Sequence, residues 1–163
     1  MQEVIHPFPP LFTENSRTLI LGSFPSVRSR EAMFFYGHPQ NRFWKVTALV
    51  FGEKVPGTIE EKKELILSHE LALWDSIHSC RITGSSDSSV RDVVPNDLGY
   101  VISGSSINRI FCNGTLSYNM YQKYILPSTG IEAVKLPSTS PANAAYSLER
   151  LVSEWRIIAE RSR

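Results

Sequence analysis

A short apolar run that breaks into a loop of small residues constrains the fold of this chain most. Residues 18–21 are typical of a buried β-strand, and Gly22-Ser-Phe-Pro-Ser26 follows directly. An aromatic loop comes next, and a helical pattern begins at Asn41. Ligands of open α/β sheets bind at the carboxyl ends of the strands, so this loop is a candidate site. Between Glu31 and Glu53 it carries aromatic rings and an amide but no carboxylate, which suits a flat, uncharged ligand.

Composition predicts one domain across residues 1–163, with a Pro-rich arm over residues 1–17. The net charge of +1 is not that of a protein that binds nucleic acid through its overall field. Cys80 and Cys112 are expected to be buried free thiols. No apolar stretch approaches the roughly 20 residues of a membrane span, and the first residues do not read as a secretory signal. We therefore expect a cytoplasmic protein with no membrane association.

Apolar periodicity predicts strands that alternate with helices, which indicates a parallel sheet covered on both faces. The expected strands are Thr18–Ser23, Leu71–Ile77, Ile107–Cys112 and Ile131–Leu136. The expected helices run from Asn41 to Gly52, from the capping box Thr58-Ile-Glu-Glu61, from Asn96 or Asp97 to Ser103, from Thr115 to Tyr124 and from Asn143 to Arg161. Residues 84–89 are expected to form a loop. The loops 22–41, 75–80 and 137–142 are expected to converge on one site.

Two serines after the first strand raise the possibility of nucleophilic catalysis. Ser23 would be the nucleophile, and Asp75-Ser-Ile-His78 supplies an acid and a base at another strand end. The chain beyond His78 contains no histidine, whereas some serine esterases place this pair late in the chain. A serine esterase therefore stays an alternative, and so does a simple strand-end role for Asp75 and His78.

Phosphate-loop and metal chemistry find no support in the sequence. The loop 22–26 lacks the glycine spacing and the Gly-Lys-Ser/Thr of a nucleotide cradle. The four histidines show no metal-ligand spacing with cysteines or carboxylates. We therefore expect neither a metal nor a cofactor.

Two further segments suit an aromatic base attached to a phosphate. Tyr36 precedes Gly37, and a ring opposite a glycine makes a slot in which a planar base can stack. Pro137-Ser-Thr-Ser-Pro141 offers hydroxyl groups and amide N–H groups to an anion, although the same residues could simply cap a helix.

From about Thr18 to the last helix, the chain resembles the uracil-DNA glycosylase superfamily. The segment His38-Pro-Gln-Asn-Arg-Phe-Trp-Lys45 matches the His-Pro-x-Asn-Arg-Phe-Trp-Lys of its mismatch-specific group. The segment Leu136-Pro-Ser-Thr-Ser-Pro-Ala-Asn143 resembles the superfamily's second motif, a loop that enters the minor groove. Phe24 stands where the mismatch group has its catalytic asparagine. The pattern is closer to the hypoxanthine-DNA glycosylase branch, in which the catalytic asparagine maps onto Asn41.

The resemblance implies a monomeric three-layer α/β/α sandwich with a four-stranded parallel sheet in the order 2-1-3-4. It implies a monofunctional glycosylase that flips a deaminated base, above all hypoxanthine, out of DNA and hydrolyses its N-glycosidic bond. Asn41 would position the water. The base would contact Ser23, Phe24, Tyr36, Gly37 and Asn113. The DNA backbone and minor groove would contact Ser26, Ser138, Thr139, Ser140, Pro141 and Ala142.

Two alternatives remain open within this resemblance. One is a uracil or mismatch-specific glycosylase, although Ser138 replaces the histidine that supports a leaving uracil in the uracil enzymes. The other is a nucleic-acid-binding relative without catalytic activity, because Phe24 replaces the mismatch group's asparagine and no water-activating aspartate follows the first strand.

Overall fold

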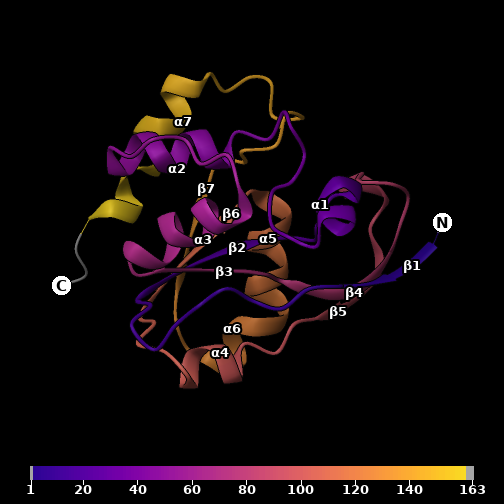
Figure 1. Cartoon of the computed structure of the whole chain (residues 1–163). Coiled ribbons are helices and arrows are strands. Elements are labelled where there is room, and N and C mark those ends of the chain that lie inside the picture. The colour runs from indigo at the N-terminus through magenta and orange to yellow at the C-terminus, as the bar shows by residue number, and fades with distance from the viewer. Residues whose placement is uncertain (1, 161–163) are drawn as a thin grey trace.

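A computed structural model of the chain describes residues 2–160. Its centre is a parallel sheet in the order β3-β2-β6-β7 (Figure 1). The strands are β2 (Thr18–Gly22), β3 (Leu71–Asp75), β6 (Arg109–Asn113) and β7 (Ala133–Leu136). Numbered along the chain within this sheet, that order is 2-1-3-4, so the predicted topology is confirmed.

The first strand of this sheet lies at its centre because it can be buried on both faces. Leu19, Ile20 and Leu21 are fully buried, as expected for an interior strand of a parallel sheet. In the register, Leu21 lies beside Trp74 of β3 on one side and beside Cys112 of β6 on the other. The loops that follow these strands therefore leave the sheet at one edge.

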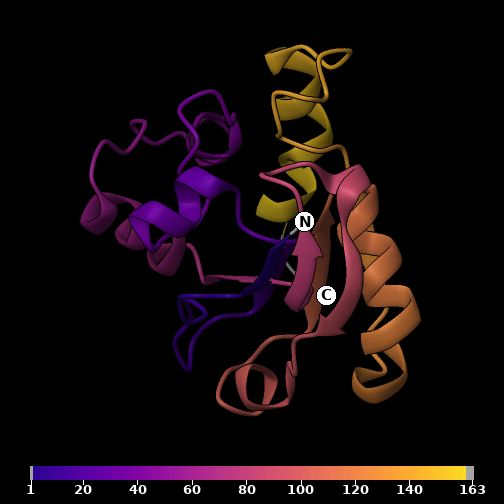
Figure 2. The ribbon, with the colours of Figure 1, turned by 90° about the vertical axis from the view of Figure 1, so that its right-hand side faces the viewer.

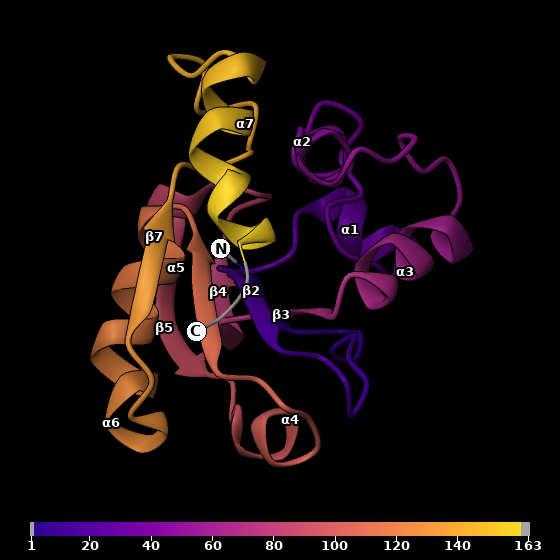
Figure 3. The ribbon, with the colours of Figure 1, turned by 90° about the vertical axis from the view of Figure 1, so that its left-hand side faces the viewer.

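Helices cover both faces of the sheet, as Figures 2 and 3 show. On one side lie α1 (Val27–Ala32), α2 (Phe43–Phe51) and α3 (Ile59–Ser68). On the other side α5 (Thr115–Met120) continues through a π-helical turn (Tyr121–Ile125) into α6 (Leu126–Thr129). The remaining helices are α4 (Gly99–Ser103) and α7 (Leu148–Trp155), and single 3₁₀ turns span Asp87–Ser89 and Arg156–Ala159. The predicted three-layer architecture is confirmed.

Local signals in the sequence set two helix ends. Thr58 caps α3, and its hydroxyl accepts a hydrogen bond from the Glu61 N–H at 3.1 Å. Gly52 ends α2 with a φ of 67°, a left-handed conformation that glycine adopts without strain. α7 packs against α2, where the ring of Trp155 meets that of Phe43 edge-on.

A second sheet was not predicted. It is antiparallel, in the order β1-β4-β5, with β1 (Gln2–Ile5), β4 (Ile77–Ile82) and β5 (Arg91–Pro95). The arm predicted for residues 1–17 thus contributes a strand that the sequence did not indicate, and the loop expected at 75–80 was wrong because β4 begins at Ile77. β1 is short and mostly exposed, so it shows no clean apolar alternation. Register shifts interrupt the pairing of β4 with β5, so these strands lack a regular alternation as well.

Two helix predictions also need correction. α1 was not predicted, and Ser26 caps it by accepting a hydrogen bond from the Ser29 N–H. The last helix does not start at Asn143 but at Leu148, after the cap residue Ser147. It ends at Trp155 and passes into a 3₁₀ turn, and its expected end, Arg161, lies outside the described residues.

Candidate active site

A cavity of about 1180 Å³ opens at the carboxyl ends of the parallel strands. Its walls come from the loop after β2, the end of β3, the end of β6 and the loop after β7. Segments 22–41 and 137–142 thus converge, as predicted. Of segment 75–80 only Asp75 lines the cavity, because the residues beyond it run away as β4.

Asn41 lies in the cavity wall at the start of α2, and its amide orientation is fixed. Its Oδ1 accepts hydrogen bonds from the Phe43 N–H at 2.9 Å and from the Thr139 hydroxyl at 2.8 Å. Because both partners are hydrogen-bond donors, the amide atom that faces them is the oxygen and not the nitrogen. Within residues 2–160, Nδ2 has no hydrogen-bond partner, which leaves two N–H groups for a ligand or water.

Thr139 links Asn41 to Asn113. Asn113 accepts the Thr139 N–H and donates from Nδ2 to the Thr139 hydroxyl, both at 3.0 Å. Thr139 is fully buried. Its assignment to the DNA backbone therefore needs correction, because its hydroxyl is committed to the two amides. Asn113 still lines the cavity, where its side-chain amide also acts on the Tyr36 hydroxyl.

Arg42 holds the loop that follows β7. Its guanidinium donates to the carbonyl oxygens of Ser140, Asn143 and Tyr146. The bonds to Asn143 and Tyr146 engage carbonyl oxygens that a helix starting at Asn143 would have used, and α7 instead starts after its cap residue Ser147. Ser138 and Ser140 lie half-buried in this loop, while Pro141 and Ala142 form its exposed tip.

Gly114 lets this loop approach β6 closely. Its φ is 94°, and a Cβ there would lie 3.2 Å from the Ser138 Cβ. The Ser138 hydroxyl accepts a hydrogen bond from the Ser140 N–H at 3.1 Å. The loop is therefore ordered by its own hydrogen bonds and by Arg42.

Tyr36 lines the cavity with its ring stacked on Phe43 at 4.0 Å, so only one ring face is available to a base. Its hydroxyl is buried and has no hydrogen-bond partner among residues 2–160. Burial and the nearby Asp75 raise the pKa of Tyr36 above its usual value, against a smaller opposing effect of the Asn113 amide, so this phenol stays neutral.

Gly37 serves a different purpose from the predicted one. It is not part of the cavity wall, and a Cβ at this position would lie 3.2 Å from the Ser29 Cα of α1. Its N–H also donates to the Ser29 hydroxyl. The glycine is needed for packing on α1 and not to make room beside a base.

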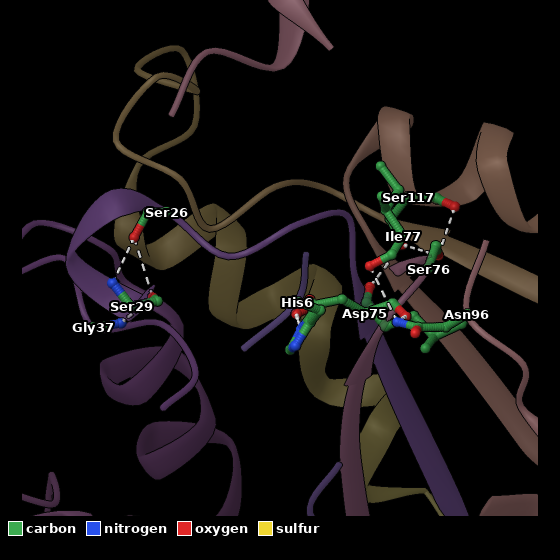
Figure 4. A network of polar contacts seen from close by, with 10 residues as sticks. His6, Ser26, Ser29, Gly37, Asp75, Ser76, Ile77, Asn96 and Ser117 are labelled. Carbon is green, nitrogen blue, oxygen red and sulfur yellow. Dashed lines mark hydrogen bonds and ion pairs between the residues drawn. The ribbon is translucent and has the colours of Figure 1, made fainter. Parts of the chain in front are cut away.

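Asp75, at the end of β3, forms a buried pair with His6 that the sequence did not predict. Asp75 Oδ2 lies 2.6 Å from His6 Nε2, and both residues are buried (Figure 4). His6 follows β1, so the second sheet brings it to the site. The spacing of 69 residues leaves no local signal that could have revealed the contact.

The predicted esterase arrangement does not form. His78 is exposed on β4, and Asp75 is paired with His6 instead. The His6 side chain is fully enclosed, and its Nδ1 has no partner within the described residues, so it does not reach the Ser23 hydroxyl. Ser23 and Phe24 nevertheless line the cavity, as does Ser26 with its hydroxyl bound to Ser29.

The cavity lining includes many polar side chains and one buried carboxylate, that of Asp75. Burial raises the pKa of Cys112, on β6, to about 12, so this thiol is not a nucleophile near neutral pH.

Among residues 2–160, no group of three or more His, Cys, Asp or Glu side chains is placed to hold a metal ion. Within the same span, no helix has the length and apolar character needed to cross a membrane.

Two relatives resemble this chain along almost its whole length. A protein named hypoxanthine DNA glycosylase from Methanosarcina acetivorans is 34% identical over 152 residues, which are 93% of this chain and 95% of the relative. A protein of the same name from Methanosarcina barkeri is 31% identical over 150 residues, 91% of this chain and 93% of the relative.

The fold has a solved counterpart as well. The solution NMR structure of a protein from Methanosarcina acetivorans, proposed to be a uracil DNA glycosylase, superposes with a TM-score of 0.79 and 29% identity. The match covers 96% of this chain and all of the other. No protein-family model matches the sequence. On the identity and coverage of the two relatives, the chain belongs to the hypoxanthine DNA glycosylase family.

Proposed function

We propose that this protein is a monofunctional DNA glycosylase that removes hypoxanthine from deoxyinosine in DNA. The observation that carries the proposal is the geometry at Asn41, in a chain that belongs to this family. Two hydrogen bonds fix its amide, its Nδ2 has no partner within residues 2–160, and the residue lines the cavity. At about 1180 Å³ the cavity exceeds the usual 300–1,000 Å³ of small-molecule pockets, which suits a nucleotide that stays attached to its strand.

The target base must leave the duplex before it can enter this cavity. Enzymes that act on a base flip the whole nucleotide out, and the energy required is lowest for weakly paired bases. Hypoxanthine arises opposite thymine, with which it pairs poorly. Flipping therefore favours the damaged base before any contact in the cavity discriminates it.

Asn41 would position the water that attacks the sugar. An amide is too weak a base to remove a proton, but Nδ2–H can donate to one lone pair of a water and leave another for C1′. The C1′–N9 bond breaks with its electron pair on the base, and water oxygen bonds to C1′. The water loses one proton and the base gains one, which yields an abasic site and free hypoxanthine. The transition state resembles an oxocarbenium ion, so a positioned water is a sufficient nucleophile.

The remaining contacts divide between base and backbone. The free face of the Tyr36 ring would stack on the base, with Ser23, Phe24 and Asn113 around its edge. Ser138 and Ser140 would bind phosphates, because they lie beside the exposed tip Pro141–Ala142 that would face the minor groove. Ala142 is a small side chain for such a tip, so we expect weak intercalation.

Hypoxanthine is preferred over uracil in this proposal because Ser138 stands where uracil enzymes carry a histidine. A uracil glycosylase remains the second candidate, because the structural neighbour was proposed to be one. We further propose that the single domain acts as a monomer in the cytoplasm, on DNA that contains deaminated bases and without a metal or cofactor.

Incubation of purified protein with oligonucleotides that carry one inosine, uracil or xanthine tests the proposal. Abasic sites are revealed by strand cleavage in hot alkali. We expect cleavage at inosine first, and cleavage at uracil alone would favour the second candidate. Binding without abasic sites on any substrate would identify a non-catalytic relative.

A further inference from the structure

The Asp75 carboxylate is held with one oxygen tied down and the other directed to the cavity end. Oδ2 lies 2.6 Å from His6 Nε2, which must be the donor when its partner is a carboxylate, while Oδ1 has no hydrogen bond to any other described residue. Oδ1 lies over Gly22, where a Cβ would come within 2.4 Å of it and within 3.1 Å of the Tyr36 hydroxyl. Gly22 therefore leaves open the space in which these two polar groups face the cavity.

The surroundings of this pair fix its geometry. His6 is packed among the rings of Phe8, Phe24, Phe35 and Trp74, with centroid distances from 4.4 to 6.4 Å. The backbone at Asp75 is also fixed, because Asn96 Nδ2 donates to the carbonyl oxygens of Asp75 and Ile77 (Figure 4). His6 is thus restrained by packing and the Asp75 backbone by hydrogen bonds, and precise recognition requires such restraint.

The cavity end at Asp75 holds a polar group without a partner. The Tyr36 hydroxyl, which lines the cavity, is buried with no hydrogen-bond partner within residues 2–160. His6 Nδ1 and Trp74 Nε1 have none among these residues either, but neither residue lines the cavity. Buried polar atoms are normally hydrogen-bonded, and each exception calls for an explanation such as a ligand or an ordered water. The Asp75–Tyr36 end of the cavity is therefore built to receive a polar ligand edge.

We propose that Asp75 Oδ1, positioned by His6, accepts the ring N–H that distinguishes a deaminated base from its parent. A carboxylate only accepts hydrogen bonds. Hypoxanthine has an N1–H next to its 6-oxygen, whereas adenine has a bare N1 lone pair next to its amine. The carboxylate thus attracts the product of deamination and repels the normal base.

This inference deepens the proposed function and rests on it. Uracil and xanthine carry an equivalent ring N–H, so the same contact would admit them and reject cytosine. Guanine has the N–H too, and its stable pairing with cytosine is what keeps it in the duplex. The inference also gives the second sheet a purpose, since β1 delivers His6 to the carboxylate.

A substrate analogue tests the contact without altering the protein. In 1-methyl-2′-deoxyinosine, a methyl group replaces the N1 hydrogen and the 6-oxygen remains. We expect the wild-type protein to release this base about 10- to 100-fold more slowly than hypoxanthine in single-turnover assays, as for one hydrogen bond to a charged group. Equal rates on both substrates would overturn the proposal. Cleavage of plain inosine by the wild type reports separately on the proposed function.

Variants of Asp75 then test whether this residue causes the slower release of the methylated base. Asp75→Ala removes the acceptor, so we expect slow release of hypoxanthine but no further loss with the methylated base. Asp75→Asn can donate to adenine N1, so the inosine-to-adenine rate ratio should fall about 10-fold or more. The matched control is Asp97→Asn, an exposed carboxylate outside the cavity, which should leave the ratio unchanged. If Asp75→Asn slowed every substrate by one common factor, the group would act in catalysis or folding and not in selection.

His6 is tested as a positioning residue by His6→Phe, which fills the aromatic surroundings but has no N–H. We expect the inosine-to-adenine ratio to fall in this variant, with partial recovery in His6→Gln. The double variant His6→Phe/Asp75→Ala should be no less selective than Asp75→Ala alone. A lower melting temperature with an unchanged ratio would show that His6 only anchors β1, and would overturn its part in the proposal.

Discussion

The cavity wall around Asn41, Asn113 and Thr139 is joined by hydrogen bonds, whereas the wall around Tyr36 and Asp75 contains a buried hydroxyl with no partner among residues 2–160. In the first wall, each amide oxygen accepts at least one protein donor and the Thr139 hydroxyl both accepts and donates. In the second, the unpaired group is the Tyr36 hydroxyl, and the Asp75 carboxylate beside it is held by His6 from behind the wall.

The difference indicates separate tasks for the two walls. Side chains that hydrogen-bond to one another are held in one geometry before a ligand arrives, which favours a role in the reaction step. A buried group without a partner costs about 1–3 kcal/mol, and a ligand that supplies the missing hydrogen bond recovers that energy. The proposed division is therefore that the bonded wall holds the reacting water through Asn41, and that the wall around Tyr36 and Asp75 selects the deaminated base.

The largest expected effect is at Asn41. Asn41→Ala removes the N–H groups that would hold the water, so we expect single-turnover release of hypoxanthine to fall about 10²–10³-fold, or about 2.7–4 kcal/mol. DNA binding should change little, because phosphate contacts set ground-state affinity. Release at the wild-type rate would show that Asn41 does not take part in the reaction, and would contradict the proposed difference between the two walls.

A control separates catalysis from folding, since Asn41 Oδ1 also accepts the Phe43 N–H. Thr139→Val deletes the hydroxyl that donates to Asn41 but keeps the Asn41 side chain. We expect it to lower the melting temperature at least as much as Asn41→Ala does, with a smaller loss of rate. If the rate followed the melting temperature across both variants, Asn41 would be structural.

Arg42 tests whether the bonded wall depends on its support. Lysine cannot reproduce a guanidinium that meets three carbonyl oxygens at once, so Arg42→Lys should lower the free energy of unfolding by about 1.5–3 kcal/mol. Urea denaturation measures this change. Lys45→Ala on the same helix is the control, and as an exposed position it should change stability by about 0.5 kcal/mol or less. Equal values for the two variants would show that Arg42 does not hold the loop.

Ser138 probes the DNA side of the bonded wall. Ser138→Ala should weaken binding of inosine DNA about 2- to 10-fold, as expected for one hydrogen bond, with a milder change in the single-turnover rate at saturation. Fluorescence anisotropy with labelled duplex measures the affinity. Ser103→Ala on α4, outside the cavity, should bind as the wild type does. A loss of rate without a loss of affinity would move Ser138 from the backbone to the reacting base.

The sequence predicted the bonded wall far better than the unpaired one. The strand before Gly22, the motif around Asn41 and the loop after β7 each carry a local signal, and parallel strands bring such loops to one edge. Asp75 was noticed, but its spacing suggested His78 as partner. Only the antiparallel pairing of β1 with β4 brings His6 there, and no local pattern encodes a contact over 69 residues.

The smallest expected effect is at Tyr36, where the two walls differ most. Tyr36→Phe removes a buried hydroxyl that has no partner among residues 2–160, so the stability of the free protein at pH 8 should be unchanged or slightly higher. The ring remains for stacking, and only one neutral hydrogen bond to the polar base edge is lost, so release of hypoxanthine should fall by only about 2-fold, the low end for such a bond. Tyr36→Ala should lose about 1–3 kcal/mol of base stacking as well. If Tyr36→Phe lost as much activity as Tyr36→Ala, the hydroxyl and not the ring face would provide the main contact with the base.

The pH dependence of the same variant gives an independent check on the hydroxyl. The folded-state pKa of Tyr36 is raised above 10.0, its usual value. Below pH 10 both states are protonated and the phenol adds no pH dependence. Above pH 10 it ionises in the unfolded chain only, so wild-type stability should fall by up to about 1.4 kcal/mol per pH unit through this group. Tyr36→Phe lacks that loss, so its stability relative to the wild type should increase between pH 10 and 11 in urea denaturation. A constant difference across this range would mean that the hydroxyl reaches water or a partner in the folded protein, and the wall around it would then resemble the bonded one.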